Sequence, residues 1–294
     1  MAIRTDLALE LLEQQPDAEV MQREIQLEGF PLHQVTITKE HTRFGKPPGK
    51  YDTLSIDPLL HRETDAFPRA CHAVAQALEQ LVPPLQDPRS TVLVIGLGNR
   101  AITPDAIGPL CCQSVLATRH LVERSPTQFR AFRPVTVLAP GVLGMTGVET
   151  GEIVLGVISR IQPGLVIAVD ALAARRLSRL MRTIQMTDTG IVPGSGVGNA
   201  RTALTQKELG VPVLAIGVPT VVDGATLAED IADQTGASCE ALDDLHTPVL
   251  VTTRDVDQQV TDAARVIGYG INLFLHPSLA VSYTHLTLPT ILLV

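Results

Sequence analysis

Two aspartates stand where chemistry is expected in an alternating strand–helix chain. Asp170 ends the apolar run VIAVD, and Asp105 follows another apolar run, VLVIGL, through the loop GNRAITP. Ligands and reacting groups gather outside the carboxyl ends of strands in open α/β sheets. If the two strands are neighbours, the carboxyls face each other and share a proton, so that one activates water while the other polarises a carbonyl. This pattern predicts acid–base hydrolysis of a peptide bond.

Structural alternatives exist for both residues. Asp105 stands close to a predicted helix start, where a negative charge interacts favourably with the helix dipole. An aspartate at a strand end also commonly caps the helix that follows. A dinucleotide loop is less well supported, because GLGN supplies only the first part of the glycine pattern and no acidic residue ends the next predicted strand, VTVLAP.

Further loops offer groups that could line a peptide-binding cleft. In addition to Gly98 and Asn99, where a tight turn would let a peptide backbone approach a carboxylate, the segment 140–152 contains Gly144, Gly147 and Glu149. Arg175 and Arg176 follow Asp170 and could pair with acidic side chains of a peptide. A solvated helix face would explain the two arginines equally well. The glycine-rich segment 190–201 could bind an anion or a substrate strand, although tight turns near a subunit contact explain it slightly better.

The elements that must position these residues alternate along the chain. Strands are predicted at 90–97, 134–140, 164–172, 182–191 and 211–222, and helices at 72–82, 104–123, 149–161 and 254–276. Strands that alternate with helices indicate βαβ crossovers. We therefore expect a three-layer α/β fold with a largely parallel twisted sheet and helices on both faces. Residues 43–57 read as a polar link.

Composition narrows the class of protein. The 294 residues carry a net charge of −8, which argues against direct nucleic-acid binding. Four cysteines lack the spacing of a disulfide framework or a zinc site, so free thiols are expected, and no metal or cofactor is predicted. We find neither a signal peptide nor a long uncharged apolar segment, and expect a cytoplasmic protein without membrane association.

The motifs resemble one protein family. GLGN, TPDAIGP, APGVLGMTGVET, VIAVDALAAR, TIQMTDTGIVPGSGVGN and AIGVPTVVD occur in this order over about residues 90–225, and IRTDLALE and VTTRDVD extend the match toward both ends. Together they resemble the germination proteases of endospore-forming bacteria. The resemblance implies a single domain over residues 1–281, with a core at about 86–225, an N-terminal region 1–85 and a C-terminal helical region 226–281. Residues 282–294 are out of character and are expected to be a non-native tail.

The resemblance also implies a function. It points to an endopeptidase that degrades small acid-soluble spore proteins during germination in the spore core, with a fold related to the hydrogenase maturation proteases. The family is usually homotetrameric and is made as a zymogen, yet only Met1 and Ala2 precede Ile3 here, so the start corresponds to the mature end or is misplaced or truncated. By motif, the aspartates proposed to be catalytic fall on Asp105 and Asp170. A metal-dependent maturation protease with the same carboxylates as ligands and a non-enzymatic α/β binding module are the alternatives.

Overall fold

The computed structural model describes residues 5–14, 20–38, 46–83, 85, 87, 89–195, 201–235 and 249–279. In these residues the strands form one nine-stranded sheet in the order β1-β2-β3-β7-β8-β6-β4-β5, with β9 paired to β8. The strands are β1 (Val20–Leu27), β2 (Phe30–Ile37), β3 (Gly49–Ser55), β4 (Val92–Gly96), β5 (Val135–Leu138), β6 (Leu165–Ala174), β7 (Thr183–Thr187), β8 (Val213–Asp223) and β9 (Leu250–Val251). The predicted tail, 282–294, lies outside the described residues.

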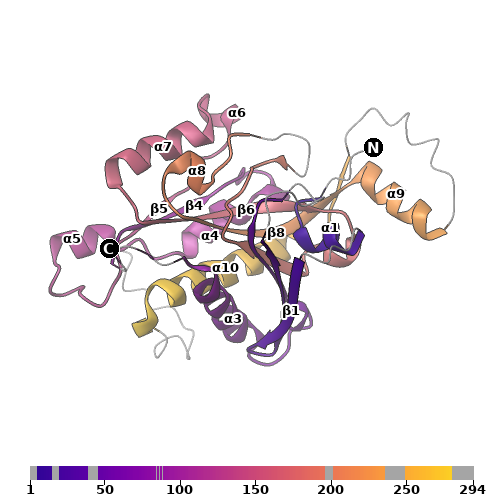
Figure 1. Ribbon diagram of the computed structural model, residues 1–294, viewed down its shortest axis with the longest axis horizontal. Helices are drawn as coiled ribbons and strands as arrows, with labels where there is room; N and C mark the ends of the chain where they lie inside the picture. The colour runs from indigo at the N-terminus through magenta and orange to yellow at the C-terminus, as the bar shows by residue number, and fades with distance from the viewer. Residues whose placement is uncertain are drawn as a thin grey trace.

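Helices cover both faces of this sheet (Figure 1). On one side lie α6 (Leu143–Thr146), α7 (Thr150–Ile161) and α8 (Gln206–Leu209), and on the other α3 (Ala66–Leu81), α4 (Ile107–Ser114) and α10 (Val256–Leu275). The remaining helices are α1 (Ala8–Gln14), α2 (Asp57–Leu60), α5 (Arg119–Arg124) and α9 (Gly224–Thr235). The three-layer α/β architecture expected from the sequence is confirmed.

The central strands are buried on both faces. Every residue of β4 and β8 is buried, and so are nine of the ten residues of β6. Unbroken apolar runs of this kind are typical of strands covered by helices on both sides. The helix side that carries α3, α4 and α10 has the larger buried cluster, and the side that carries α7 and α8 has a smaller one.

The sheet is mixed and not largely parallel. Parallel pairing joins β5 to β4, β4 to β6 and β6 to β8, whereas β1, β2, β3, β7, β8 and β9 are joined by antiparallel pairs. The expected parallel arrangement is therefore found among β5, β4, β6 and β8, and the other strand pairs are antiparallel. Short connections cause the difference, since a tight turn such as Glu28–Gly29 between β1 and β2 can join only antiparallel strands.

Two further expectations need correction. The polar link predicted at 43–57 contains β3, which pairs with both β2 and β7 and attaches the N-terminal strands to the core sheet. The helix predicted at 104–123 is divided into a 3-10 helix, η1 (Thr103–Asp105), α4 and α5. The buried side chain of Asn272 causes the second break, because it accepts from the Leu116 amide and donates to the Ser114 carbonyl at 2.8 Å each.

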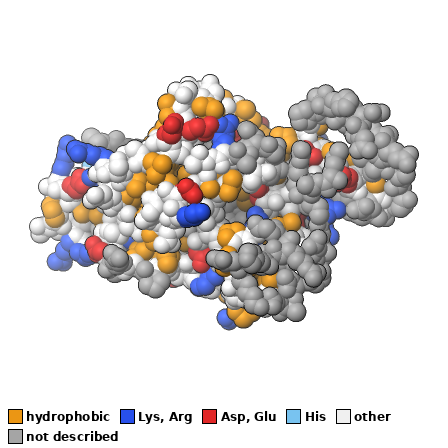
Figure 2. All heavy atoms as spheres, turned by 45° about the horizontal axis from the view of Figure 1, so that its top comes forward, with side chains coloured by type: hydrophobic (Ala, Val, Ile, Leu, Met, Phe, Trp, Pro, Cys, Tyr) orange, Lys and Arg blue, Asp and Glu red, His pale blue; other side chains and the backbone are white. Residues whose placement is uncertain are grey.

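None of the described helices is long and apolar enough to cross a bilayer. Figure 2 shows one face of the molecule, on which Lys and Arg side chains are scattered in small groups among uncharged atoms.

Candidate active site

A tight loop after β4 holds Asp105. The backbone amide of Asn99 donates to Asp105 Oδ2 at 2.8 Å. This contact needs a glycine at position 98, where φ is +105° and a Cβ atom would lie 2.1 Å from the Asp105 carbonyl oxygen and 2.9 Å from Oδ1. The Asp105 side chain does not cap α4, whose first turn has no side-chain cap. Asp105 is therefore held as a hydrogen-bond acceptor at the end of η1, directly before the N-cap of α4, a position at which its charge also interacts favourably with the helix dipole.

Asp170 lies within β6, one residue beyond the last pair that β6 makes with β4, Gly96 with Val169. Its carboxylate is 5% exposed and accepts from the Ala171 amide at 2.9 Å. Asp170 follows Ala168 by two residues, and alternation along the strand places its side chain on the face of α7 and α8, where Ala168 is buried. It does not cap a helix, since β6 continues to Ala174.

Close backbone packing brings the two aspartates together. The strands β4 and β6 are neighbours, and the Leu97 amide donates to the Val169 carbonyl at 2.8 Å. The first turn of α4 lies directly on them, because a Cβ atom at Gly108 would be 2.3 Å from the Leu97 oxygen and 2.5 Å from the Val169 oxygen. The turn that carries Asp105 is thus held against the end of β6. The charges of Asp105 and Asp170 act on each other across this contact.

The two carboxyls have unequal surroundings. Burial raises the pKa of Asp170 well above its ordinary value, and the negative charges of Asp105 and Asp6 raise it further. The hydrogen bond from the Ala171 amide lowers the pKa and only partly offsets these effects. Burial also raises the pKa of Asp105, but the Asn99 amide and the positive charge of Arg201 oppose that increase. The surroundings therefore favour the protonated form of Asp170 more strongly than that of Asp105.

A third carboxylate, which sequence patterns did not single out, borders the pair. Asp6 accepts from the Ala173 amide at 2.9 Å and from the Ser195 hydroxyl at 2.7 Å, and its own amide donates to the Ala173 carbonyl at 3.1 Å. Lys46 Nζ donates to the Asp6 carbonyl at 3.0 Å. The one available signal was the position of Asp6 inside the motif IRTDLALE.

A pocket of about 290 Å³ lies beside these groups. Its lining includes Asp6, Lys46, Leu172 and Gly217. Gly217 is the register partner of Asp170 on β8, and Leu172 is two residues beyond Asp170 on β6. The pocket therefore lies next to the position of Asp170 on β6, and neither Asp105 nor Asp170 is among its lining residues.

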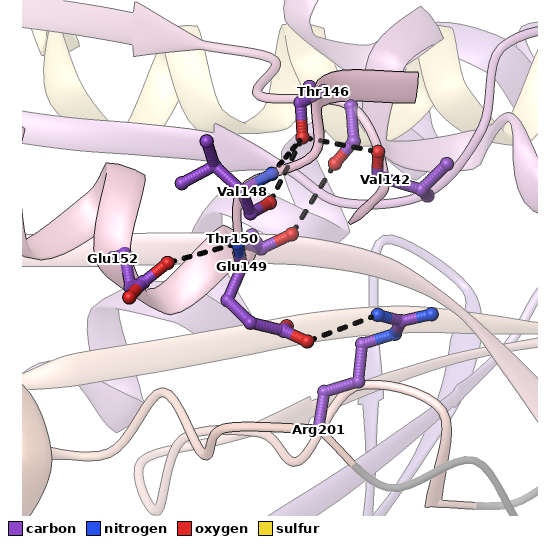
Figure 3. Close-up of polar contacts among 8 residues, drawn as sticks. Val142, Thr146, Val148, Glu149, Thr150, Glu152 and Arg201 are labelled. Carbon is purple, nitrogen blue, oxygen red and sulfur yellow. Dashed lines mark hydrogen bonds and ion pairs between the residues drawn. The ribbon is translucent and has the colours of Figure 1, made fainter. Parts of the chain in front are cut away.

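Glu149 begins α7 and forms a capping box with Glu152. Glu149 Oε1 also lies 3.6 Å from Arg201 Nη1, as Figure 3 shows. The other oxygen, Oε2, is buried and has no hydrogen-bond partner in the described part of the chain. Arg201 was not selected individually from the sequence, although it ends the glycine-rich segment 190–201 that was considered for substrate binding.

The other predicted substrate-binding residues lie in different surroundings. Gly144 and Gly147 are exposed in and after α6, with open space around the position of a Cβ atom. The backbone amides of Arg175 and Arg176 donate to the buried Glu10 carboxylate at 2.8 and 3.0 Å. Substrate binding by these four residues, and by Gly98, Asn99 and Glu149, stays a prediction.

No group of three or more His, Cys, Asp or Glu side chains within the described ranges is arranged to hold a metal ion. Cys71 and Cys111 are buried free thiols, and Cys112 is a partly buried one.

The family profile and the curated relatives agree on one family. The profile described as Germination protease matches residues 5–235. A germination protease of Caldanaerobacter subterraneus is 42% identical, and the match covers 95% of this chain and 96% of the relative. A germination protease of Clostridium perfringens is 38% identical, and the match covers 94% of this chain and 96% of that relative. Among solved structures, the [NiFe] hydrogenase maturation protease HycI of Thermococcus kodakarensis matches with a TM-score of 0.36 and 17% identity, over 66% of this chain and 98% of that one.

Proposed function

The chain belongs to the germination protease family, a family of endopeptidases, and from this premise we propose that it cleaves small acid-soluble spore proteins with water activated by Asp105 and Asp170. The observation that carries the proposal is the unequal aspartate pair, with Asp170 on β6 just beyond its pairing with β4 and Asp105 in the turn that follows β4, inside the segment that matches the family.

The unequal pair suits hydrolysis without a covalent intermediate. Ionised Asp105 accepts a proton from water while the water oxygen attacks the scissile carbonyl carbon. Protonated Asp170 donates to the carbonyl oxygen and stabilises the charge that develops there. Breakdown of the tetrahedral intermediate breaks the C–N bond as Asp105 passes the proton it took from water to the leaving amine. The carbonyl re-forms and returns a proton to Asp170, so that one water molecule is consumed for each peptide bond.

Other properties of the family extend to this chain as part of the same proposal. They are the spore core as the place of action, a homotetrameric assembly, and synthesis as a zymogen. Direct binding to nucleic acid is not part of the proposal, given the net charge of −8. The names of the curated relatives support the link to germination.

The test is cleavage of a purified small acid-soluble spore protein by the full chain and by Asp105→Asn and Asp170→Asn. Each substitution removes one ionisable carboxyl at nearly constant size, and kcat/KM should fall by about 10³-fold or more because proton transfer is lost. Asp52→Asn is the matched control, since Asp52 is a buried aspartate on β3 whose partner is Gln34. Near-normal cleavage by Asp170→Asn would rule out the aspartate pair.

A chelator separates this mechanism from the metal-dependent alternative. The same cleavage assay after exhaustive treatment with EDTA should retain its rate if Asp105 and Asp170 act on water by themselves. Loss of activity on chelation and its return with a divalent metal would favour the alternative, in which the two carboxylates are metal ligands.

A further inference from the structure

The proposed mechanism requires that two neighbouring carboxyls differ. Both are drawn toward the neutral form by burial, so a specific group must favour the ionised form of Asp105. The Asn99 amide is one such group, but it is a neutral donor. A positive charge would have a longer reach than a single hydrogen bond.

Arg201 supplies a positive charge on the correct face of the sheet. Its backbone amide donates to the Pro193 carbonyl at 3.0 Å, which anchors the residue at the return of the loop. Three residues later Leu204 is fully buried in the cluster that also contains Leu97 and Ala168. Leu97 adjoins the glycine loop and Ala168 precedes Asp170 by two residues, so the segment of Arg201 runs over the ends of both strands.

The start of α7 holds the guanidinium in place. A Cβ atom at Gly151 would lie 2.9 Å from Thr202 Cγ2, so the first turn of α7 packs directly on the residue after Arg201. Glu149 then reaches the Arg201 guanidinium across a 3.6 Å gap (Figure 3). The Arg201 side chain is only 27% exposed, which limits the screening of its charge by solvent.

Among the groups around Asp105, Arg201 is the cation whose charge acts on it. The elements against η1 are α4, α10, β6 and β8. Titratable side chains on three of them are Cys111 and Cys112 on α4, Asp170 on β6 and Asp223 on β8. Those on α10 are Asp257, Asp262, Arg265 and Tyr269. Of these, Asp170 is the group coupled to Asp105, and the positive charge of Arg201 is what acts on Asp105 in the opposite sense.

We propose that Arg201 is a positioning residue of the active site, whose guanidinium, held by Glu149 at the start of α7, provides the positive charge that distinguishes Asp105 from Asp170. The inference rests on the proposed function and deepens it, because it names the group that assigns the two aspartates their separate roles. Arg201 acts through Asp105 and needs no contact with the reacting atoms.

The test is the pH dependence of kcat/KM for cleavage of a small acid-soluble spore protein by the full chain. Activity falls in acid as Asp105 becomes protonated. Loss of the positive charge in Arg201→Gln raises the pKa of Asp105, so the acid limb should move upward by about 0.5–1 pH unit. Cleavage then drops about 3- to 10-fold at a pH on that limb, and the two profiles converge at higher pH. Arg201→Lys, which keeps the charge, should restore most of the shift.

A matched control is Arg119→Gln, which removes one positive charge and one ion pair, that between Arg119 and Glu123 on α5. Its acid limb should coincide with that of the unchanged protein. A uniform loss of activity in Arg201→Gln without a moved limb would indicate a structural role, and a raised KM with an unmoved limb would indicate substrate binding. Either result overturns the inference.

The same experiment includes Asp105→Asn to keep the two proposals apart. If Asp105→Asn cleaves normally, the proposed aspartate mechanism is wrong, whatever Arg201 does. If Asp105→Asn is inactive and the limb of Arg201→Gln is unmoved, the mechanism stands and only the role of Arg201 is wrong.

Discussion

Two buried carboxylates near the C-terminal part of β6, Glu10 and Asp170, differ in their hydrogen bonds and in the charges beside them. Glu10 is 1% exposed and accepts hydrogen bonds from the amides of Arg175 and Arg176 and from the Thr5 hydroxyl. Asp170 is 5% exposed and, among the described residues, accepts one hydrogen bond, from the Ala171 amide. It also lies beside a second carboxylate, Asp105. Burial alone therefore does not distinguish them.

The difference in hydrogen bonding separates a structural role from a chemical one. A buried carboxylate that accepts several hydrogen bonds from different segments joins those segments of the chain. Glu10 joins α1 to the residues that follow β6 in this way. A buried carboxylate with few donors and a like-charged neighbour is destabilised when ionised, and groups of that kind are candidates for acid–base chemistry.

The largest effect on stability is expected at Glu10. In Glu10→Gln an NH₂ group replaces one carboxylate oxygen, so that two hydrogen-bond donors face each other at one of the backbone N–H groups. The charge-assisted hydrogen bonds are lost as well. The free energy of unfolding should fall by about 2–3 kcal/mol. Urea denaturation at pH 7 measures it, with Glu123→Gln in a surface ion pair on α5 as the control, expected to cost under about 1 kcal/mol. An unchanged unfolding free energy for Glu10→Gln would remove the distinction between the two carboxylates.

Replacing Asp170 is expected to raise the free energy of unfolding, whereas replacing Glu10 lowers it. Its folded-state pKa is raised, so between the unfolded value near 4 and the folded value the native state binds more protons than the unfolded state. Stability is therefore lost as pH rises through that window. Asp170→Asn removes the titration and should stabilise the fold at pH 7 by about 1–2 kcal/mol while abolishing cleavage.

Urea denaturation of Asp170→Asn at two pH values checks this prediction. The gain over the unchanged protein should shrink toward zero well below pH 4, where the carboxyl is protonated in both states. A loss of stability in Asp170→Asn at pH 7 would show that Asp170, like Glu10, is a structural group.

The smallest effect is expected from Asp6, whose negative charge adds to the increase in the pKa of Asp170. In Asp6→Asn the pKa of Asp170 should fall. If Asp170 acts as the proposed acid, activity is lost as it ionises, and the alkaline limb of kcat/KM should move to lower pH by a few tenths of a pH unit. An upward movement of that limb would show that the Asp6 charge does not raise the pKa of Asp170.

Much of the core could be predicted from local patterns. The apolar runs of β4, β6 and β8 and the helical spacing of α7 and α10 identify themselves within a few residues, as does the aspartate at the end of VIAVD. Local patterns could not predict β3 or the break between α4 and α5. The strand β3 contains polar residues and follows a Gly/Pro-rich stretch, and its strand conformation depends on pairing with β2 and β7. The break between α4 and α5 depends on Asn272 of the C-terminal helix.

Some residues of the candidate site could be predicted from local patterns, and others could not. Asp105 and Asp170 could be selected from the sequence because each follows an apolar run, and a run of that kind by itself predicts a buried strand with its end at the edge of a sheet. The close approach of the two could not be settled from residue spacing, since it requires that β4 and β6 be neighbours and that α4 lie on both. Arg201 and Asp6 were missed because they approach the pair from distant parts of the chain.

The amino-acid sequence by itself established the family, the alternation of strands and helices, and the two aspartates, because these depend on residue type and short-range spacing. Only the tertiary structure decided how differently the surroundings act on the two aspartates. That difference depends on burial, on the Asn99 and Ala171 amides, and on the charges of Arg201 and Asp6. Electrostatic interactions act through space, and the distances that govern them exist only after the chain has folded.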